Sequence, residues 1–208
     1  MYRDEYDVLF SRQSLRDWLQ NRLESAEQLV NKFTAEDFAR STDDQLAAGI
    51  RSQLGVSPIV WDKSQPEITK VEREIDVSDD PRRARSREGP VMIPGTEFIY
   101  SYQFSGTTEL LWLKPMRWSS SLPRASVGTA RLKIGVLVPT DSIDVDEIGK
   151  DALAEFDSVK SHLSVSAEQV QEYSKELPTR IRTALAKRRA SLSSADAALE
   201  ELRKRSDK

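Results

Sequence analysis

The chain has 208 residues, of which 38% are hydrophobic and 31% charged, and its formal net charge is −3. This length can bury a hydrophobic core, and the balanced charge gives neither a dominant basic surface for nucleic acid nor an acidic tail. The chain has no cysteine, which excludes disulfides, thiolate metal sites and cysteine nucleophiles. We expect no signal peptide and no membrane span, because no apolar run approaches the roughly 20 residues that cross a bilayer. The expected location is therefore the cytoplasm.

Residues 1–56 have the pattern of a helical hairpin. Apolar side chains in residues 15–33 recur every three or four positions, with charged side chains opposite, as in a helix with one buried face. Thr42 is followed three residues later by Gln45, which is the spacing of a capping box at the start of a second helix. Gly55 supplies the end of that helix.

Residues 57–140 predict an antiparallel sheet of about five strands. Phe98, Tyr100, Tyr102 and Phe104 alternate with other residues, so a strand here presents four aromatic rings on one face. We expect that face to pack under the C-terminal helices rather than to stack bases. The predicted strands are residues 59–61, 67–77 (an edge strand), 98–104, 108–113 and 129–138.

A basic loop interrupts this region at residues 78–90. The segment has almost no apolar residues and carries four arginines: Arg82, Arg83, Arg85 and Arg87. Guanidinium groups bind phosphate and carboxylate well, so the loop is a candidate contact to nucleic acid, to a nucleotide or to an acidic protein surface. The alternative is a solvated loop whose arginines pair with Asp79, Asp80 and Glu88.

Residues 141–208 return to helical periodicity. We expect several helices here, with breaks near Ser166 and at the two serines 193 and 194, and with a kink or a restart at Pro178. Arg182 and Arg189 are seven residues apart and share a helix face, which makes them a possible second basic site or simply a solvated face.

Acidic residues gather just before this helical region, at Asp141, Asp144, Asp146 and Glu147. Such a group can bind a cation, but acids at a helix N-terminus also interact favourably with the helix dipole. We favour the second interpretation.

The usual catalytic patterns are absent from the sequence. It has no glycine-rich phosphate loop, no Gly-x-Ser-x-Gly elbow, and no Glu-x-Lys pair of a metal-dependent nuclease. His162 is the sole histidine, and we expect it at the surface or at its boundary. The sequence therefore predicts no catalytic, metal-binding or cofactor-binding residues, and a protein that is not an enzyme.

Several short motifs resemble a region of uncharacterised bacterial proteins. They are Gly95-Thr96, Phe104-Ser105-Gly106, Leu113-Lys114-Pro115, and Ile181, Leu185 and Arg188-Arg189. In those proteins this N-terminal scaffold region, here residues 95–192, is followed by a restriction-endonuclease-like or TIR effector domain. The resemblance implies a role in phage defence and carries no catalytic residues. The sequence as it stands shows no effector domain after the scaffold, and we therefore expect the effector on a separate polypeptide.

The sequence thus predicts one α+β unit: a helical hairpin, a central antiparallel sheet and long C-terminal helices. Its predicted function is that of a non-catalytic interaction or regulatory subunit that docks or controls an effector, in a bacterial defence complex. The helices carry more apolar surface than one modest sheet covers, so we expect a protein partner or a homo-oligomer. The alternative function is a nucleic-acid or nucleotide-binding module that uses the arginines of residues 82–87.

Overall fold

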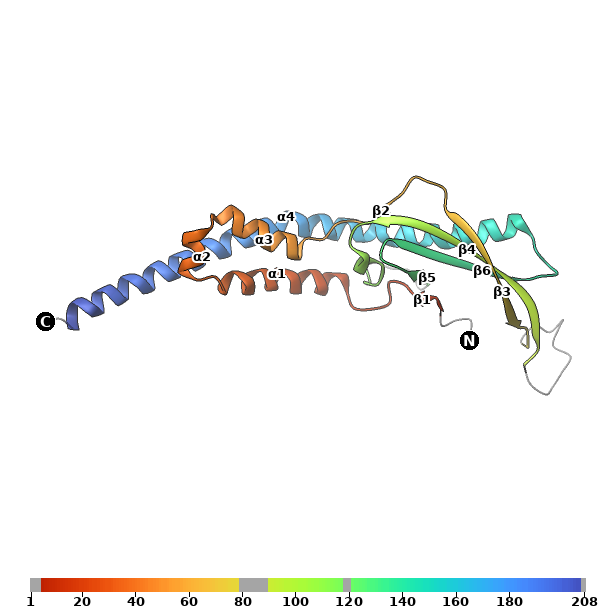
Figure 1. Ribbon diagram of the computed structural model, residues 1–208, viewed down its shortest axis with the longest axis horizontal. Coiled ribbons are helices and arrows are strands. Elements are labelled where there is room, and N and C mark those ends of the chain that lie inside the picture. Colours follow the sequence, from red (N-terminus) through yellow and green to blue (C-terminus); the bar gives the residue numbers. More distant parts are fainter. Residues whose placement is uncertain (1–4, 79–89, 118–120, 207–208) are drawn as a thin grey trace. The chain divides into compact units, whose positions relative to one another are not determined.

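A computed structural model describes residues 5–78, 90–117 and 121–206 (Figure 1). The protein mixes helices with an antiparallel sheet, in agreement with the predicted α+β class. The chain forms two compact units, and each combines two separate stretches of sequence. The first unit consists of Met1–Arg12 and Pro58–Val165, and the second of Gln13–Ser57 and Ser166–Lys208.

The first unit contains a six-stranded antiparallel sheet within the described residues. Its strands are β1 (Asp7–Val8), β2 (Val60–Trp61), β3 (Glu67–Asp76), β4 (Met92–Ser105), β5 (Arg124–Val127) and β6 (Arg131–Pro139). Their order is β1-β5-β6-β4-β2, and β3 pairs with β4. Strand β4 is the longest, because it pairs with β6 on one side and with both β2 and β3 on the other.

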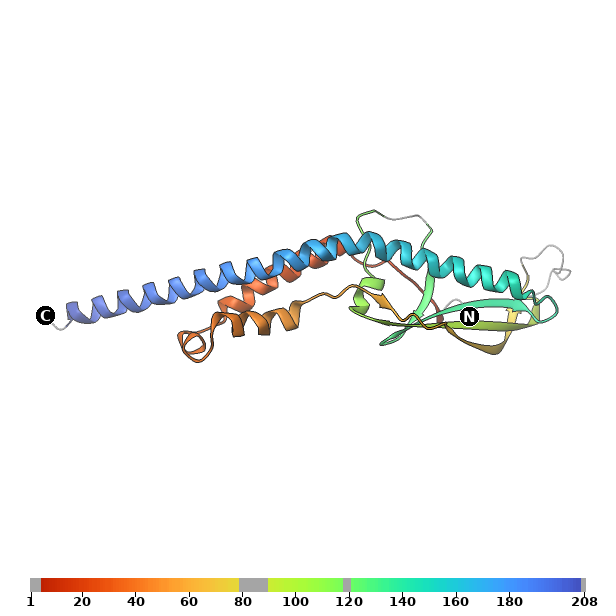
Figure 2. The same cartoon turned by 90° about the horizontal axis from the view of Figure 1, so that it is seen from above.

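The first turns of helix α4 (Val145–Ser206) lie along one face of this sheet (Figure 2). The aromatic face predicted for β4 packs there, since the Tyr102 ring stacks on Phe156 of α4 with centroids 3.7 Å apart. The core of the unit also includes Phe104, Leu132 and Ile134, all of them buried. The side-chain alternation of β4 therefore places its aromatic residues against α4, as expected.

Residues 108–113 do not form the predicted strand. They begin with a short 3-10 helix, η2 (Thr108–Leu111). Leu110, Leu111 and Leu113 are all buried, whereas a strand directs adjacent side chains to opposite faces. Before this segment the chain turns at Gly106, whose φ of 114° suits glycine, and a Cβ there would collide with the Pro58 carbonyl.

Two strands in the sheet were not predicted. Strand β1 pairs with β5, and β5 pairs with only two residues of β6. Both are too short to show a reliable alternation in sequence. By contrast, β3 was predicted correctly, and all ten of its residues pair with β4.

The second unit contains three helices from its first stretch of sequence: α1 (Leu15–Asn31), α2 (Ala35–Arg40) and α3 (Asp43–Leu54). The predicted capping box is present, because the Thr42 hydroxyl accepts from the Gln45 N–H and the Gln45 side chain accepts from the Thr42 N–H. A second capping box at Thr34 starts α2, which adds a third helix to the two that were predicted.

Helix α4 runs without interruption for 62 residues, so the breaks predicted near Ser166 and at serines 193 and 194 are wrong, as is a restart at Pro178. Its buried positions continue through Ser166 and past Pro178, and they include Tyr173, Leu177 and Ile181. Tyr173 is also tied to α3, because its hydroxyl donates to the Leu54 carbonyl at 2.6 Å. Packing on one face thus holds the helix together even at Pro178. Among the described residues, no helix combines the length and the apolar character needed to cross a membrane.

Candidate interaction site

Of the predicted basic residues, the structure describes only Arg182 and Arg189. Arg82, Arg83, Arg85 and Arg87 lie outside the described residues. Arg189 of α4 pairs with Asp43, and its guanidinium lies 4.7 Å from the centroid of the Phe38 ring. Arg182 is exposed, and none of the ion pairs among the described residues involves it.

The last turns of α4 carry an exposed continuation of a buried apolar stripe. Leu185 is buried in the second unit, and Leu192 and Leu199 follow it at intervals of seven residues. This spacing keeps the three leucines on one face of the helix. Exposure rises along the series, from 1% at Leu185 to 47% at Leu199. A parallel series links buried Ile181 to Ala195 and Leu202, which is 61% exposed.

The apolar stripe of α4 becomes exposed where α4 extends beyond the helices that cover it. Arg188 of α4 donates to the Phe33 carbonyl, just beyond the end of α1. Farther along, Leu192 lines a small hollow with Phe38 of α2. Residues 193–205 are exposed all round, and ion pairs of Glu200 with Arg203 and of Glu201 with Arg205 link neighbouring turns. We call Leu192, Ala195, Leu199 and Leu202 the α4 stripe.

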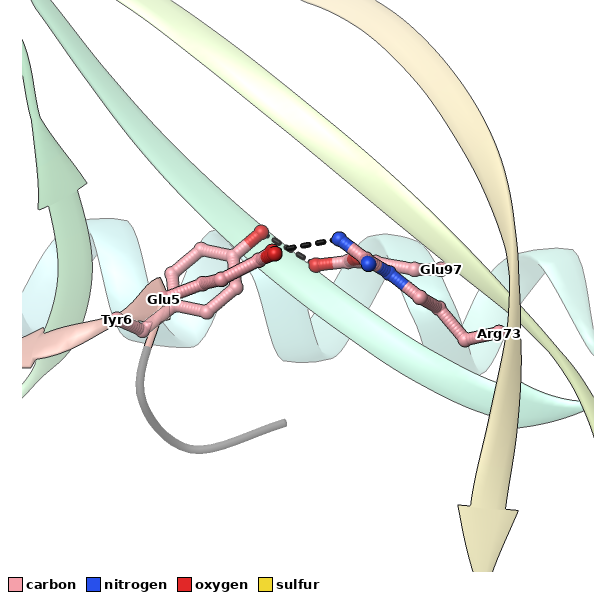
Figure 3. Close-up of polar contacts among 4 residues, drawn as sticks. All are labelled: Glu5, Tyr6, Arg73 and Glu97. Atoms are coloured by element: carbon pink, nitrogen blue, oxygen red, sulfur yellow. Dashed lines mark hydrogen bonds and ion pairs between the residues drawn. The ribbon is translucent and has the colours of Figure 1, made fainter. Parts of the chain in front are cut away.

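A buried carboxylate forms the most connected polar cluster of the first unit (Figure 3). Glu97 of β4 is fully buried. Tyr6 donates a hydrogen bond to its Oε1, and Arg73 of β3 donates to its Oε2 at 3.0 Å. Arg73 also pairs with Glu5 at 2.5 Å, and its hydrogen bond to Glu97 raises the pKa of the guanidinium further above its usual value.

The cluster has a structural role, since both carboxylate oxygens of Glu97 are engaged by groups of the chain itself. It fixes the N-terminal segment to the middle of the sheet. Gly135 of β6 makes room for it, because a Cβ at that position would collide with the Tyr6 hydroxyl and with Oε1 of Glu97. The cluster was not predicted, and its one sign in the sequence is a single acid, Glu97, within an otherwise uncharged strand.

His162 was predicted at the surface or its boundary, and this prediction is wrong. The residue is 5% exposed, and its ring stacks on Phe10 with centroids 4.8 Å apart. Its Nδ1 lies 2.8 Å from the Ser158 carbonyl oxygen. Phe10, which contacts it, comes from a segment about 150 positions earlier in the chain, so the sequence around His162 gives no sign of this burial.

The acidic residues before α4 take the role that we favoured. Oδ1 of Asp144 accepts hydrogen bonds from the backbone N–H groups of Asp146 and Glu147, at 2.9 and 3.1 Å. Asp144 thereby satisfies donors that the first turn of a helix leaves unpaired. Within the described ranges, no group of histidine or acidic side chains is arranged to hold a metal ion.

Comparison with protein-family models, with curated proteins and with solved structures finds no significant match to this chain.

Proposed function

We propose that this protein is a non-catalytic interaction or regulatory subunit that docks an effector protein through the α4 stripe. The observation that carries the proposal is the exposure of Leu199 on the same helix face that buries Leu185 two heptads earlier. Exposed leucines at heptad spacing are typical of helices that pack against another helix. The partner we propose therefore presents an amphipathic helix.

The setting of this function is also a proposal. The resemblance of residues 95–192 to defence-type scaffold regions favours a cytoplasmic complex with an effector, in a bacterial anti-phage system. The absence of the usual catalytic motifs from the sequence favours control by contact rather than by turnover.

A pair of charge substitutions on opposite faces of α4 tests the docking surface. Leu199→Glu places a carboxylate on the α4 stripe, whereas Ala197→Glu places the same group on the opposite face of the same turn. We expect the first change to abolish complex formation and the second to preserve it, because a buried unpaired charge opposes helix packing. Light scattering after size-exclusion chromatography, with the products of neighbouring genes, measures the complexes.

Two results would reject the proposal. One is a wild-type chain that stays monomeric alone and with every neighbouring gene product. The other is a complex that Leu199→Glu and Ala197→Glu leave equally stable. Circular dichroism of both variants verifies that α4 is retained, as expected for exposed positions that contribute little to folding.

A further inference from the structure

A cleft of about 620 Å³ lies entirely within the first unit. It is bounded by the end of β2 and the segment that leads into β3, by the middle of β4, and by the first half of α4. This volume falls in the range of about 300–1,000 Å³ that is usual for small-molecule sites. The cleft is separate from the α4 stripe, which belongs to the second unit.

Aromatic rings form the walls of the cleft. Tyr102 and Phe156 stack with an interplanar angle of 9°, and Trp61 meets Phe156 edge-on with ring centroids 4.9 Å apart. Tyr100 lines the same cleft, and Leu153 in it is 54% exposed to water. The four rings are half-buried, and Lys160 lies over the ring of Phe156. A flat aromatic molecule gains from such walls because it buries a large area against the parts of the rings that remain accessible.

Lys63 is the charged side chain at the cleft that has no partner among the described residues. The other charged lining residues are already engaged: Lys160 with Asp157, Glu67 with Arg131, and Asp62 with the Ser64 N–H. Tyr102 also lines the cleft, and its hydroxyl can donate a hydrogen bond. The unused polar groups of the cleft thus include an ammonium and a hydroxyl donor, which suit an anion.

We propose that this cleft binds a small planar aromatic ligand that carries one anionic group. The ring lies against Trp61, Tyr102 and Phe156, and the anionic group pairs with Lys63. This site is additional to the docking function proposed above and does not depend on it, because the two use different residues in different units.

Two glycines give a matched test. Gly149 of α4 lines the cleft, Gly49 of α3 does not, and a Cβ on either would meet no atom within 4 Å. Leucine favours helix over glycine at both positions, so we expect Gly149→Leu and Gly49→Leu to fold. The probe is 1-anilinonaphthalene-8-sulfonate, an anion with a flat naphthalene ring whose fluorescence rises on binding. We expect Gly149→Leu to raise the Kd of the probe at least about tenfold, and we expect Gly49→Leu to leave that Kd unchanged. Equal Kd values for wild type and Gly149→Leu would overturn the site.

The role of Lys63 is tested with a second probe. Lys63→Gln removes the charge at an exposed position, where the side chain makes no hydrogen bond or ion pair among the described residues. We expect it to weaken binding of the sulfonate several-fold and to leave the uncharged analogue N-phenyl-1-naphthylamine unaffected. Equal effects on the two probes, or no effect on the sulfonate, would overturn the anionic part of the proposal.

Competition identifies the source of the ligand. Displacement of the probe by adenosine monophosphate indicates a nucleotide, and displacement by indole-3-acetate indicates an aromatic carboxylic acid. Either result supports the planar class. Displacement by decanoate alone, an aliphatic anion, would overturn it.

Discussion

At the scale of single residues, the first unit depends on a charge that is removed from water. An unpaired buried carboxylate would be strongly destabilising, so its burial is possible only with donors to both oxygens. Tyr6 and Arg73 are those donors. Tyr6 comes from the segment before β1, and Arg73 comes from β3. One acid thus connects three parts of the chain, and the space at Gly135 allows it.

Neutralising this carboxylate should destabilise the protein. Glu97→Gln leaves Arg73 without its buried partner, and we expect the free energy of unfolding to fall by about 2–4 kcal/mol. Glu72→Gln is the matched control, since Glu72 is an exposed acid on neighbouring β3, and its effect should stay within about 0.5 kcal/mol. Urea denaturation measures both. A loss for Glu97→Gln no larger than that of the control would contradict the structural role of the cluster.

At the scale of elements, α4 shows how tertiary packing overrides local signals. Pro178 lacks the N–H that would bond to the carbonyl of residue 174, and this normally bends or ends a helix. Here Leu177 and Ile181 on either side of it are buried in the second unit, and Tyr173 anchors the preceding turn to the end of α3. The burial of these side chains offsets the cost of the missing hydrogen bond.

Replacing this proline should therefore stabilise the second unit. Pro178→Ala restores the N–H and removes the clash of the ring with the preceding turn, so we expect a gain of about 1–3 kcal/mol. Lys175→Ala, at an exposed position one turn earlier, controls for the effect of alanine itself and should be nearly neutral. Thermal unfolding followed by circular dichroism compares the two. A lower Tm for Pro178→Ala would show that the proline is required for the path of the helix.

At the scale of the whole molecule, each unit contains a tyrosine whose pKa is raised by burial: half-buried Tyr102 in the first and buried Tyr173 in the second. A raised pKa means that the folded state holds the proton more tightly than the unfolded state. The contribution of each tyrosine to stability is therefore fully present below the usual tyrosine pKa of 10.0, and it is lost as the pH rises through the higher folded pKa. On the acid side, Asp37 and Asp76 have lowered pKa values because they accept hydrogen bonds from Thr34 and Ser78. They favour folding above the usual value of 3.8, and this contribution is lost as the pH falls.

Tyr173→Phe tests the alkaline part of this profile. The change removes the hydrogen bond to the Leu54 carbonyl, so we expect a loss of about 1 kcal/mol at pH 7. It also removes a group that ionises, so the further loss above pH 10 should be smaller than in the wild type. Urea midpoints measured from pH 7 to pH 11 give both quantities. If the urea midpoints of wild type and Tyr173→Phe fall in parallel above pH 10, Tyr173 makes no contribution to the loss of stability there.

The sequence by itself determined the features whose causes lie within a few residues of one another. The Thr42 capping box, the edge strand at residues 67–76 and the aromatic face of β4 all follow from spacings of two to four positions. The apolar stripe of α1 is of the same kind, with Leu15, Leu19 and Leu23 buried as its period predicts. Such patterns can be read without knowing the rest of the fold.

Only the tertiary structure decided the features that join distant residues. Tyr6 and Glu97 are 91 positions apart, and Phe10 and His162 are farther still, so no local pattern reveals either pair. Strands β1 and β5, the 3-10 helix at Thr108 and the continuity of α4 through Pro178 have the same origin. In each case burial against a remote part of the chain outweighs local preference, because the free energy gained by removing apolar surface from water exceeds the small differences in propensity.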